Sequence, residues 1–146
     1  MSVEQWEDVI KVNLNSVFYM TKQIIKPMMK ARSGSIINMS SVIGEMGNAG
    51  QTSYAASKAG VLGMTKTIAK ELANNAVTCN ALALGYFDQG MISEVSEEMQ
   101  QQIISQIPKN RLGGVETVLA AIDWLLKNES DYVTGQTISL NGGLFT

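Results

Sequence analysis

The chain has 146 residues, 45% of them hydrophobic, and its 11 basic and 13 acidic residues give a net charge of −2. This length suffices for one domain with its own core. The balanced charge argues against a nucleic-acid binder, and no apolar run reaches the about 18 residues of a membrane span. With no histidine and one cysteine, the sequence excludes His-dependent triads, His-ligated metals, internal disulfides and CxxC chemistry, so we expect no metal site.

The first third of the chain predicts one long helix followed by a buried strand. Its charged start lacks the apolar core of a signal peptide, which points to a cytoplasmic protein. Ser2 and Gln5 have the spacing of a capping box, and apolar residues then recur at helical spacing as far as Met28. Pro27 is expected to bend or interrupt the last part of this helix. Residues 36–39 are typical of a short strand that ends at residues 40–41.

Three regularly spaced glycines, Gly44, Gly47 and Gly50, follow this strand and precede the next helix. A dinucleotide-binding fingerprint would lie at such a place, but it needs the spacing G-x-G-x-x-G and an acidic residue about 20 positions later. Neither feature is present here. The pattern therefore favours a flexible loop over a phosphate cradle.

Helices and strands alternate through the rest of the chain. We expect a helix over residues 54–72 capped by Ser53, an amphipathic segment over 92–104 and a helix over 115–126. Strands are expected over 77–82, which includes Cys79, and over 133–140, before a turn at 141–143. This alternation predicts an α/β fold with a parallel sheet. Three strands, beside three long helices, make a narrow parallel sheet, because sheets usually have about five or six strands. The nine methionines are interpreted as core filler.

Tyr54 and Lys58 lie four residues apart at the start of the predicted helix, so both project from one face. A free tyrosine has a pKa near 10, and an ammonium within about 6 Å favours its phenolate. Such a pair can exchange a proton with a carbonyl that becomes an alcohol, while Ser41 can hydrogen-bond the same oxygen. The Tyr-x-x-x-Lys spacing alone arises by chance in roughly one chain of this length in four. The alternative interpretation is that the two residues are simply an exposed pair on a helix.

The context of this pair resembles the short-chain dehydrogenase/reductase family. The family's serine also lies thirteen residues before its tyrosine, as Ser41 does before Tyr54. Further segments are similar at matching distances, so that the resemblance covers essentially the whole chain: residues 12–14, 38–41, 54–60, 80–81, 111–114, 134–136 and 141–143. Within the family, the chain is similar to 3-oxoacyl-[acyl-carrier-protein] reductases and acetoacetyl-CoA reductases.

The resemblance implies a role for each site residue. Tyr54 is the expected acid/base, and Lys58 holds the nicotinamide ribose and lowers the Tyr54 pKa. Ser41 orients the substrate carbonyl, Asn13 anchors a water that relays protons to Lys58, and the backbone near Phe87 lies against the nicotinamide. The implied reaction is NAD(P)H-dependent reduction of a 3-oxoacyl thioester to the 3-hydroxyacyl product, with NADPH favoured over NADH. The carrier of the acyl group is acyl carrier protein or CoA.

One departure from the family concerns its N-terminal half. The family's Thr-Gly-x-x-x-Gly-x-Gly loop and Asn-Asn-Ala-Gly motif do not occur here, so residues 1–146 resemble the C-terminal catalytic part of a Rossmann-like, doubly wound domain. In the family's strand order, the strand near Ile36 would then have an unpaired edge. The resemblance also implies a homo-tetramer built through the two long helices. The alternative is a catalytically inactive fragment that acts only through subunit association.

Overall fold

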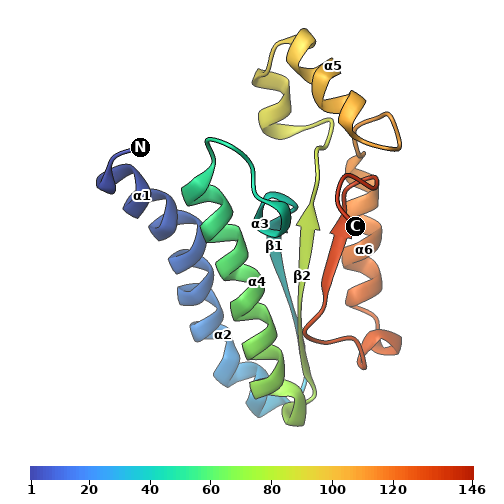
Figure 1. Ribbon diagram of the computed structural model, residues 1–146. Coiled ribbons are helices and arrows are strands. Elements are labelled where there is room, and N and C mark those ends of the chain that lie inside the picture. The colour runs from blue at the N-terminus through green and yellow to red at the C-terminus, as the bar shows by residue number, and fades with distance from the viewer.

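The computed structural model describes residues 1–146, apart from the side chain of Met91, and confirms the α/β class. Strands β1 (Gly34–Ser41), β2 (Val77–Leu84) and β3 (Thr137–Leu140) form a parallel sheet in the order β1-β2-β3. Helices lie on both of its sides, with α2 and α4 opposite α6 (Figure 1). Their bounds are α1 (Val3–Ile10), α2 (Ser16–Ala31), α3 (Ile43–Met46), α4 (Thr52–Leu72), α5 (Glu97–Gln106) and α6 (Val115–Leu125). Within the described part of the chain, none of these helices combines the length and apolar character needed to cross a bilayer.

The predicted first helix is present, but it is divided by a π-helical turn. The capping box of Ser2 and Gln5 starts α1 as expected, and the π-helical segment η1 (Lys11–Asn15) joins α1 to α2. Of the two effects expected of Pro27, a bend or an interruption, the interruption is wrong, since α2 continues through it to Ala31. A proline removes one N–H donor, and the surrounding turns hold the helix together. The chain turns out of α2 at Arg32, which has a left-handed backbone with φ of 50°.

Strand β1 lies at one edge of the sheet, as predicted. All eight of its residues pair in parallel with β2, whereas its other edge faces no strand among the described residues. Its buried side packs against α4 and the end of α2 in a core that contains Ile36, Ile68, Ala69, Leu72, Val77 and Cys79. Burial raises the pKa of the Cys79 thiol to about 12, which keeps this strand cysteine in its unreactive form.

The glycine-spaced segment is more ordered than the predicted flexible loop. It contains the one-turn helix α3, and Gly44 within α3 lies directly against the backbone of α4. A Cβ at Gly44 would stand 2.8 Å from the amide nitrogen of Ala59, so only glycine permits this contact. The prediction that Ser53 caps α4 is wrong: the helix starts at Thr52, and Ser53 is buried inside its first turn.

Replacing Gly44 with alanine is therefore expected to lower the free energy of unfolding by about 1–3 kcal/mol, because the new methyl group forces α3 away from α4. The matched control is Gly63→Ala in α4, where an added Cβ would meet nothing within 4 Å. That change should raise stability by about 0.5–1 kcal/mol, the helix-propensity gain of alanine over glycine. Urea denaturation measures both values, and equal effects of the two substitutions would contradict the close approach.

In the last third of the chain, the strand is shorter than predicted. Helix α6 is confirmed, and the amphipathic segment divides into the 3-10 turn η3 (Gly90–Glu94) and α5. Strand β3 begins only at Thr137, because residues 133–136 form a loop in which Gly135 has φ of 72°. The interpretation of methionines as core filler is wrong for most of them: exposed large hydrophobic side chains include Met1, Met20, Met29, Met39, Met46 and Met99.

Candidate active site

The predicted pair of Tyr54 and Lys58 lies in the first two turns of α4. Both side chains are half-buried, and the Lys58 ammonium nitrogen stands 5.7 Å from the centre of the Tyr54 ring. The spacing of four residues places the two side chains on one face of the helix, as expected. The same ammonium nitrogen donates a hydrogen bond of 3.1 Å to the backbone oxygen of Met39 in β1. Lys58 thus connects the tyrosine on α4 with the edge strand.

Ser41 is the last residue of β1 and pairs with Leu84 at the carboxyl end of β2. Its side chain is buried, and its Oγ accepts a hydrogen bond of 3.2 Å from the backbone N–H of Ile43. This bond fixes the hydroxyl oxygen at the start of α3, and the hydroxyl proton is still available to another acceptor. The neighbouring Ser40 donates to the backbone oxygen of Lys58 at 2.9 Å, which ties the end of β1 to α4.

Asn13 lies in the π-helical turn η1, and its amide Nδ2 donates to Ser57 Oγ at 3.3 Å. Ser57 is fully buried, and its hydroxyl donates in turn to the backbone oxygen of Tyr54 at 2.7 Å. These two bonds connect Asn13 to the helical turn that carries the tyrosine. The link that Ser57 makes between Asn13 and Tyr54 was not predicted from the sequence, where the only available signal was its position between Tyr54 and Lys58. Single-turn π bulges are frequent at functional sites, which agrees with the location of Asn13.

Phe87 lies apart from these contacts, just beyond the carboxyl end of β2. It forms an isolated parallel bridge with Gly113, and a Cβ at Gly113 would stand 2.7 Å from its ring. The ring also lines a cavity of about 540 Å³ with Pro108, Arg111 and residues 141–143. Because β1 and β2 are parallel, Phe87 and Ser41 lie at the same end of the sheet, which is where ligands bind in open α/β sheets.

Burial lowers the pKa of the Lys58 ammonium from the ordinary lysine value of 10.5. The unfolded chain therefore holds this proton more tightly than the folded chain does. The stability contributed by Lys58 should increase as the pH rises from the lowered pKa toward the ordinary value of 10.5, and should be lost as the pH falls again. Between these limits, we expect the wild type to gain stability relative to Lys58→Met.

Urea denaturation at a series of pH values measures this difference. The control is Lys66→Met, which removes an exposed lysine from the same helix. The Lys66→Met variant should differ from the wild type by the same amount at every pH, because its side chain lies in solvent and the burial argument applies only to Lys58. Parallel stability curves for the wild type and Lys58→Met would contradict the effect of burial.

Comparison with known proteins identifies the family to which the chain is similar. Residues 1–145 match the family described as enoyl-(acyl carrier protein) reductase. The 3-oxoacyl-[acyl-carrier-protein] reductase FabG of Thermotoga maritima is 49% identical over 144 residues, covering 99% of this chain and 58% of that protein. The FabG proteins of Pseudomonas aeruginosa and Escherichia coli are 43% and 41% identical over 145 residues, covering 99% of this chain and 59% of each relative.

The chain thus spans less than two thirds of the length of the curated relatives that it matches, while almost all of its own residues are matched. The family match extends over the π-helical turn, the end of β1 and the first turns of α4, which carry Asn13, Ser41, Tyr54 and Lys58. The chain belongs to the short-chain dehydrogenase/reductase family.

Proposed function

We propose that residues 1–146 form the C-terminal catalytic part of a single short-chain reductase domain. Its reaction is reduction of a 3-oxoacyl thioester to the 3-hydroxyacyl product. The observation that carries the proposal is the Lys58 ammonium beside the Tyr54 ring, at the carboxyl end of a parallel sheet. The relatives named as 3-oxoacyl-[acyl-carrier-protein] reductases support the choice of substrate.

Tyr54 is proposed as the acid that protonates the oxygen of the reduced carbonyl. The Lys58 cation stabilises the negative charge that the phenol oxygen acquires when it gives up this proton. Ser41 holds the carbonyl oxygen, because its Oγ is fixed by Ile43 and its hydroxyl proton can be donated. Asn13 is proposed to hold a water on the path by which protons reach Lys58, and its own orientation depends on Ser57.

A nicotinamide cofactor, NADPH rather than NADH, is proposed to supply the hydride. The residues near Tyr54 fit its ribose: the Lys58 ammonium has three donors, and one of them is taken by Met39. The backbone near Phe87 is proposed to lie against the nicotinamide. The glycine-spaced segment does not fit the pyrophosphate, because Gly44 packs against the α4 backbone. The glycine-spaced segment is therefore not proposed as the pyrophosphate site.

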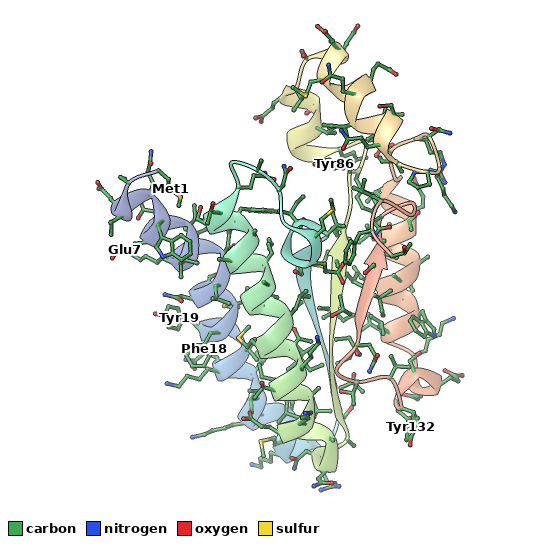
Figure 2. The ribbon with its side chains drawn as sticks, in the orientation of Figure 1. Met1, Glu7, Phe18, Tyr19, Tyr86 and Tyr132 are labelled. Atoms are coloured by element: carbon green, nitrogen blue, oxygen red, sulfur yellow. The ribbon has the colours of Figure 1, made fainter. Side chains whose placement is uncertain are left out.

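The same proposal includes the carrier of the acyl group, the cell compartment and the assembly of subunits. The acyl group is carried by acyl carrier protein or CoA, in the cytoplasm. Subunits associate as a homo-tetramer through the two long helices, α2 and α4. Phe18 and Tyr19 project outward from α2, with ring centres 5.9 Å apart, and are 49% and 57% exposed (Figure 2). Such a pair favours burial against another subunit.

The proposal is tested in a chimera in which residues 1–146 replace the matched segment of the Thermotoga maritima relative. The remaining segment then supplies what this chain lacks, and the site residues are those of this chain. We expect the chimera to oxidise NADPH when acetoacetyl-CoA is added, followed by absorbance, with no oxidation in the absence of the thioester. A folded chimera that binds NADPH and gives no turnover would contradict the proposed function.

The second candidate is a catalytically inactive chain that acts only through subunit association, and the exposed aromatic pair would serve that association equally well. This alternative predicts that the chimera assembles without turnover. Both candidates predict that a Tyr19→Glu substitution disrupts assembly, which gel filtration measures, so turnover is the result that separates them. Turnover by the chimera would exclude this alternative.

A further inference from the structure

The cavity beside Phe87 lies past the carboxyl ends of β2 and β3. Its volume is about 540 Å³, and small-molecule sites have volumes of about 300–1000 Å³. Residues 86–87, most of 108–113 and residues 139–143 line it, together with Thr117 of α6. Three segments that are distant in the sequence thus converge at the end of the sheet where open α/β proteins bind ligands. The reaction proposed above assigns no group to this cavity.

Two glycines let the walls of the cavity approach each other closely. A Cβ at Gly113 would stand 2.7 Å from the Phe87 ring, and a Cβ at Gly142 would stand 2.8 Å from the Ile107 side chain. Gly142 has a left-handed backbone with φ of 65°, and its oxygen accepts a hydrogen bond of 3.2 Å from the N–H of Lys109. Backbone contacts therefore hold the walls in place, and the cavity is a built part of the fold.

The charged residues that line the cavity are both basic. Lys109 and Arg111 belong to the lining, and none of the lining residues in the described structure is acidic, although the whole chain has a net charge of −2. Arg111 gives one N–H to the oxygen of Leu112 at 3.1 Å, and its guanidinium has further donors. The Ser139 hydroxyl donates to the Glu45 carboxylate at 2.9 Å, so an anion would bind at the two cations and not at Ser139.

The remaining walls are largely apolar. They include the rings of Tyr86 and Phe87 and the side chains of Pro108, Leu112 and Leu140. Apolar walls with a few placed polar groups are the usual composition of a small-molecule site. A free inorganic anion would leave these walls uncovered, and a neutral apolar molecule would gain nothing from the two cations. The lining therefore selects a ligand that has both an anionic head and an apolar stem.

We propose that this cavity binds an amphiphilic anion, a carboxylate or phosphate group on an apolar stem. The head group lies against Lys109 and Arg111, and the stem packs on the Phe87 ring. The two head groups share this chemistry, and the experiment below distinguishes them.

The bound stem also stabilises the bridge between Phe87 and Gly113. The N–H of Gly113 donates to the oxygen of Tyr86 at 2.9 Å, and the N–H of Asp88 donates to the oxygen of Gly113 at 3.0 Å. Because Phe87 and Gly113 both line the cavity, a ligand there covers both sides of this bridge. Binding thereby orders the backbone near Phe87. Its effect on the nicotinamide rests on the function proposed above, whereas the binding itself does not.

The test titrates the ¹⁵N-labelled 146-residue chain with hexanoate, hexyl phosphate and 1-hexanol at constant ionic strength. Both anions are expected to bind with a Kd of about 5 mM or tighter, as their size allows. Hexanol should bind at least about fivefold more weakly, since each exposed ion pair contributes a few-fold. The amide resonances of Gly113 and Asp88 should shift, and their hydrogen exchange should slow by at least about threefold at saturation.

The anion that binds more tightly identifies the head group. Hexanol that binds as tightly as the two anions would overturn the proposal, and so would inorganic phosphate that binds as tightly as hexyl phosphate. Unchanged exchange at Gly113 and Asp88 would overturn the effect on the bridge.

Variants of both parts of the cavity make the assignment specific. The double substitution of Lys109→Met and Arg111→Met should weaken both anions at least about fivefold and leave hexanol unchanged. Its matched control is Lys127→Met, which removes an exposed lysine outside the lining and should bind as the wild type does. Phe87→Ala should weaken the anions and hexanol alike, by at least about threefold. The charge variants keep the test valid if Phe87→Ala does not fold, and anion binding that survives the loss of both charges would overturn the proposal.

Discussion

In the active chimera, replacing Tyr54 with phenylalanine is expected to lower kcat by at least about 100-fold, the usual contribution of a general acid. The substitution removes the phenol oxygen and leaves the ring that packs beside the Lys58 ammonium. The fold should therefore be unchanged, and the substrate should still bind through Ser41. A fall in kcat with little change in KM would identify an interaction made only in the transition state.

The control for this variant is Tyr132→Phe, because Tyr132 is 98% exposed and projects from the end of the molecule remote from the site (Figure 2). It should retain full turnover. Thermal unfolding of both variants separates loss of chemistry from loss of structure. If Tyr54→Phe kept more than about a tenth of the turnover, the proton would have another source and the proposed role of Tyr54 would be wrong.

The elements with strong periodicity could be predicted from the sequence. The capping box at Ser2 and the apolar stripe that follows it gave the first helix, and the short apolar run around Ile36 gave β1. Their start and end signals are local, so they need no knowledge of the rest of the fold. The unpaired edge of β1 could also be predicted, but only through the strand order that the family resemblance implied.

The errors arose where tertiary contacts override local signals. Val133 has a high strand propensity, but the hydrogen bond from Asn80 and the left-handed backbone of Gly135 hold its segment as a loop. Serine is a residue type that often caps helices, yet Ser53 is buried one residue inside α4. In each case, the deciding partner is distant in the sequence, and propensity alone carries no information about it.

In the candidate site too, local features could be predicted from the sequence and tertiary contacts could not. The spacing of Tyr54 and Lys58 determined that they share a helix face. The bond from Lys58 to Met39 and the bond from Asn13 to Ser57 depend on how β1 and η1 pack against α4, so the spacing could not predict them. Burial of Lys58 is likewise a result of this packing.

Replacing Asn80 with alanine is expected to lower the free energy of unfolding by about 2–4 kcal/mol, because two partly buried backbone groups lose their partner. The Asn80 side chain is fully buried in β2. Its Nδ2 donates to the oxygen of Val133 at 2.7 Å, and its Oδ1 accepts from the N–H of Gln136 at 3.0 Å. These two bonds fasten the loop that delivers the chain into β3, so their loss should also loosen the pairing of β2 with β3.

Urea denaturation with hydrogen exchange at Ile138 measures both effects, and Gln136→Ala is the matched control. The Gln136 side chain is exposed and bonds only within its own loop, to the oxygen of Thr134. Its removal should change stability by no more than about 0.5 kcal/mol, since its backbone N–H still donates to Asn80. If the two variants were equally stable, the register of β3 would be held by its own strand pairing. The buried amide would then have no part in positioning the carboxyl end of the sheet, where Ser41 and Phe87 lie.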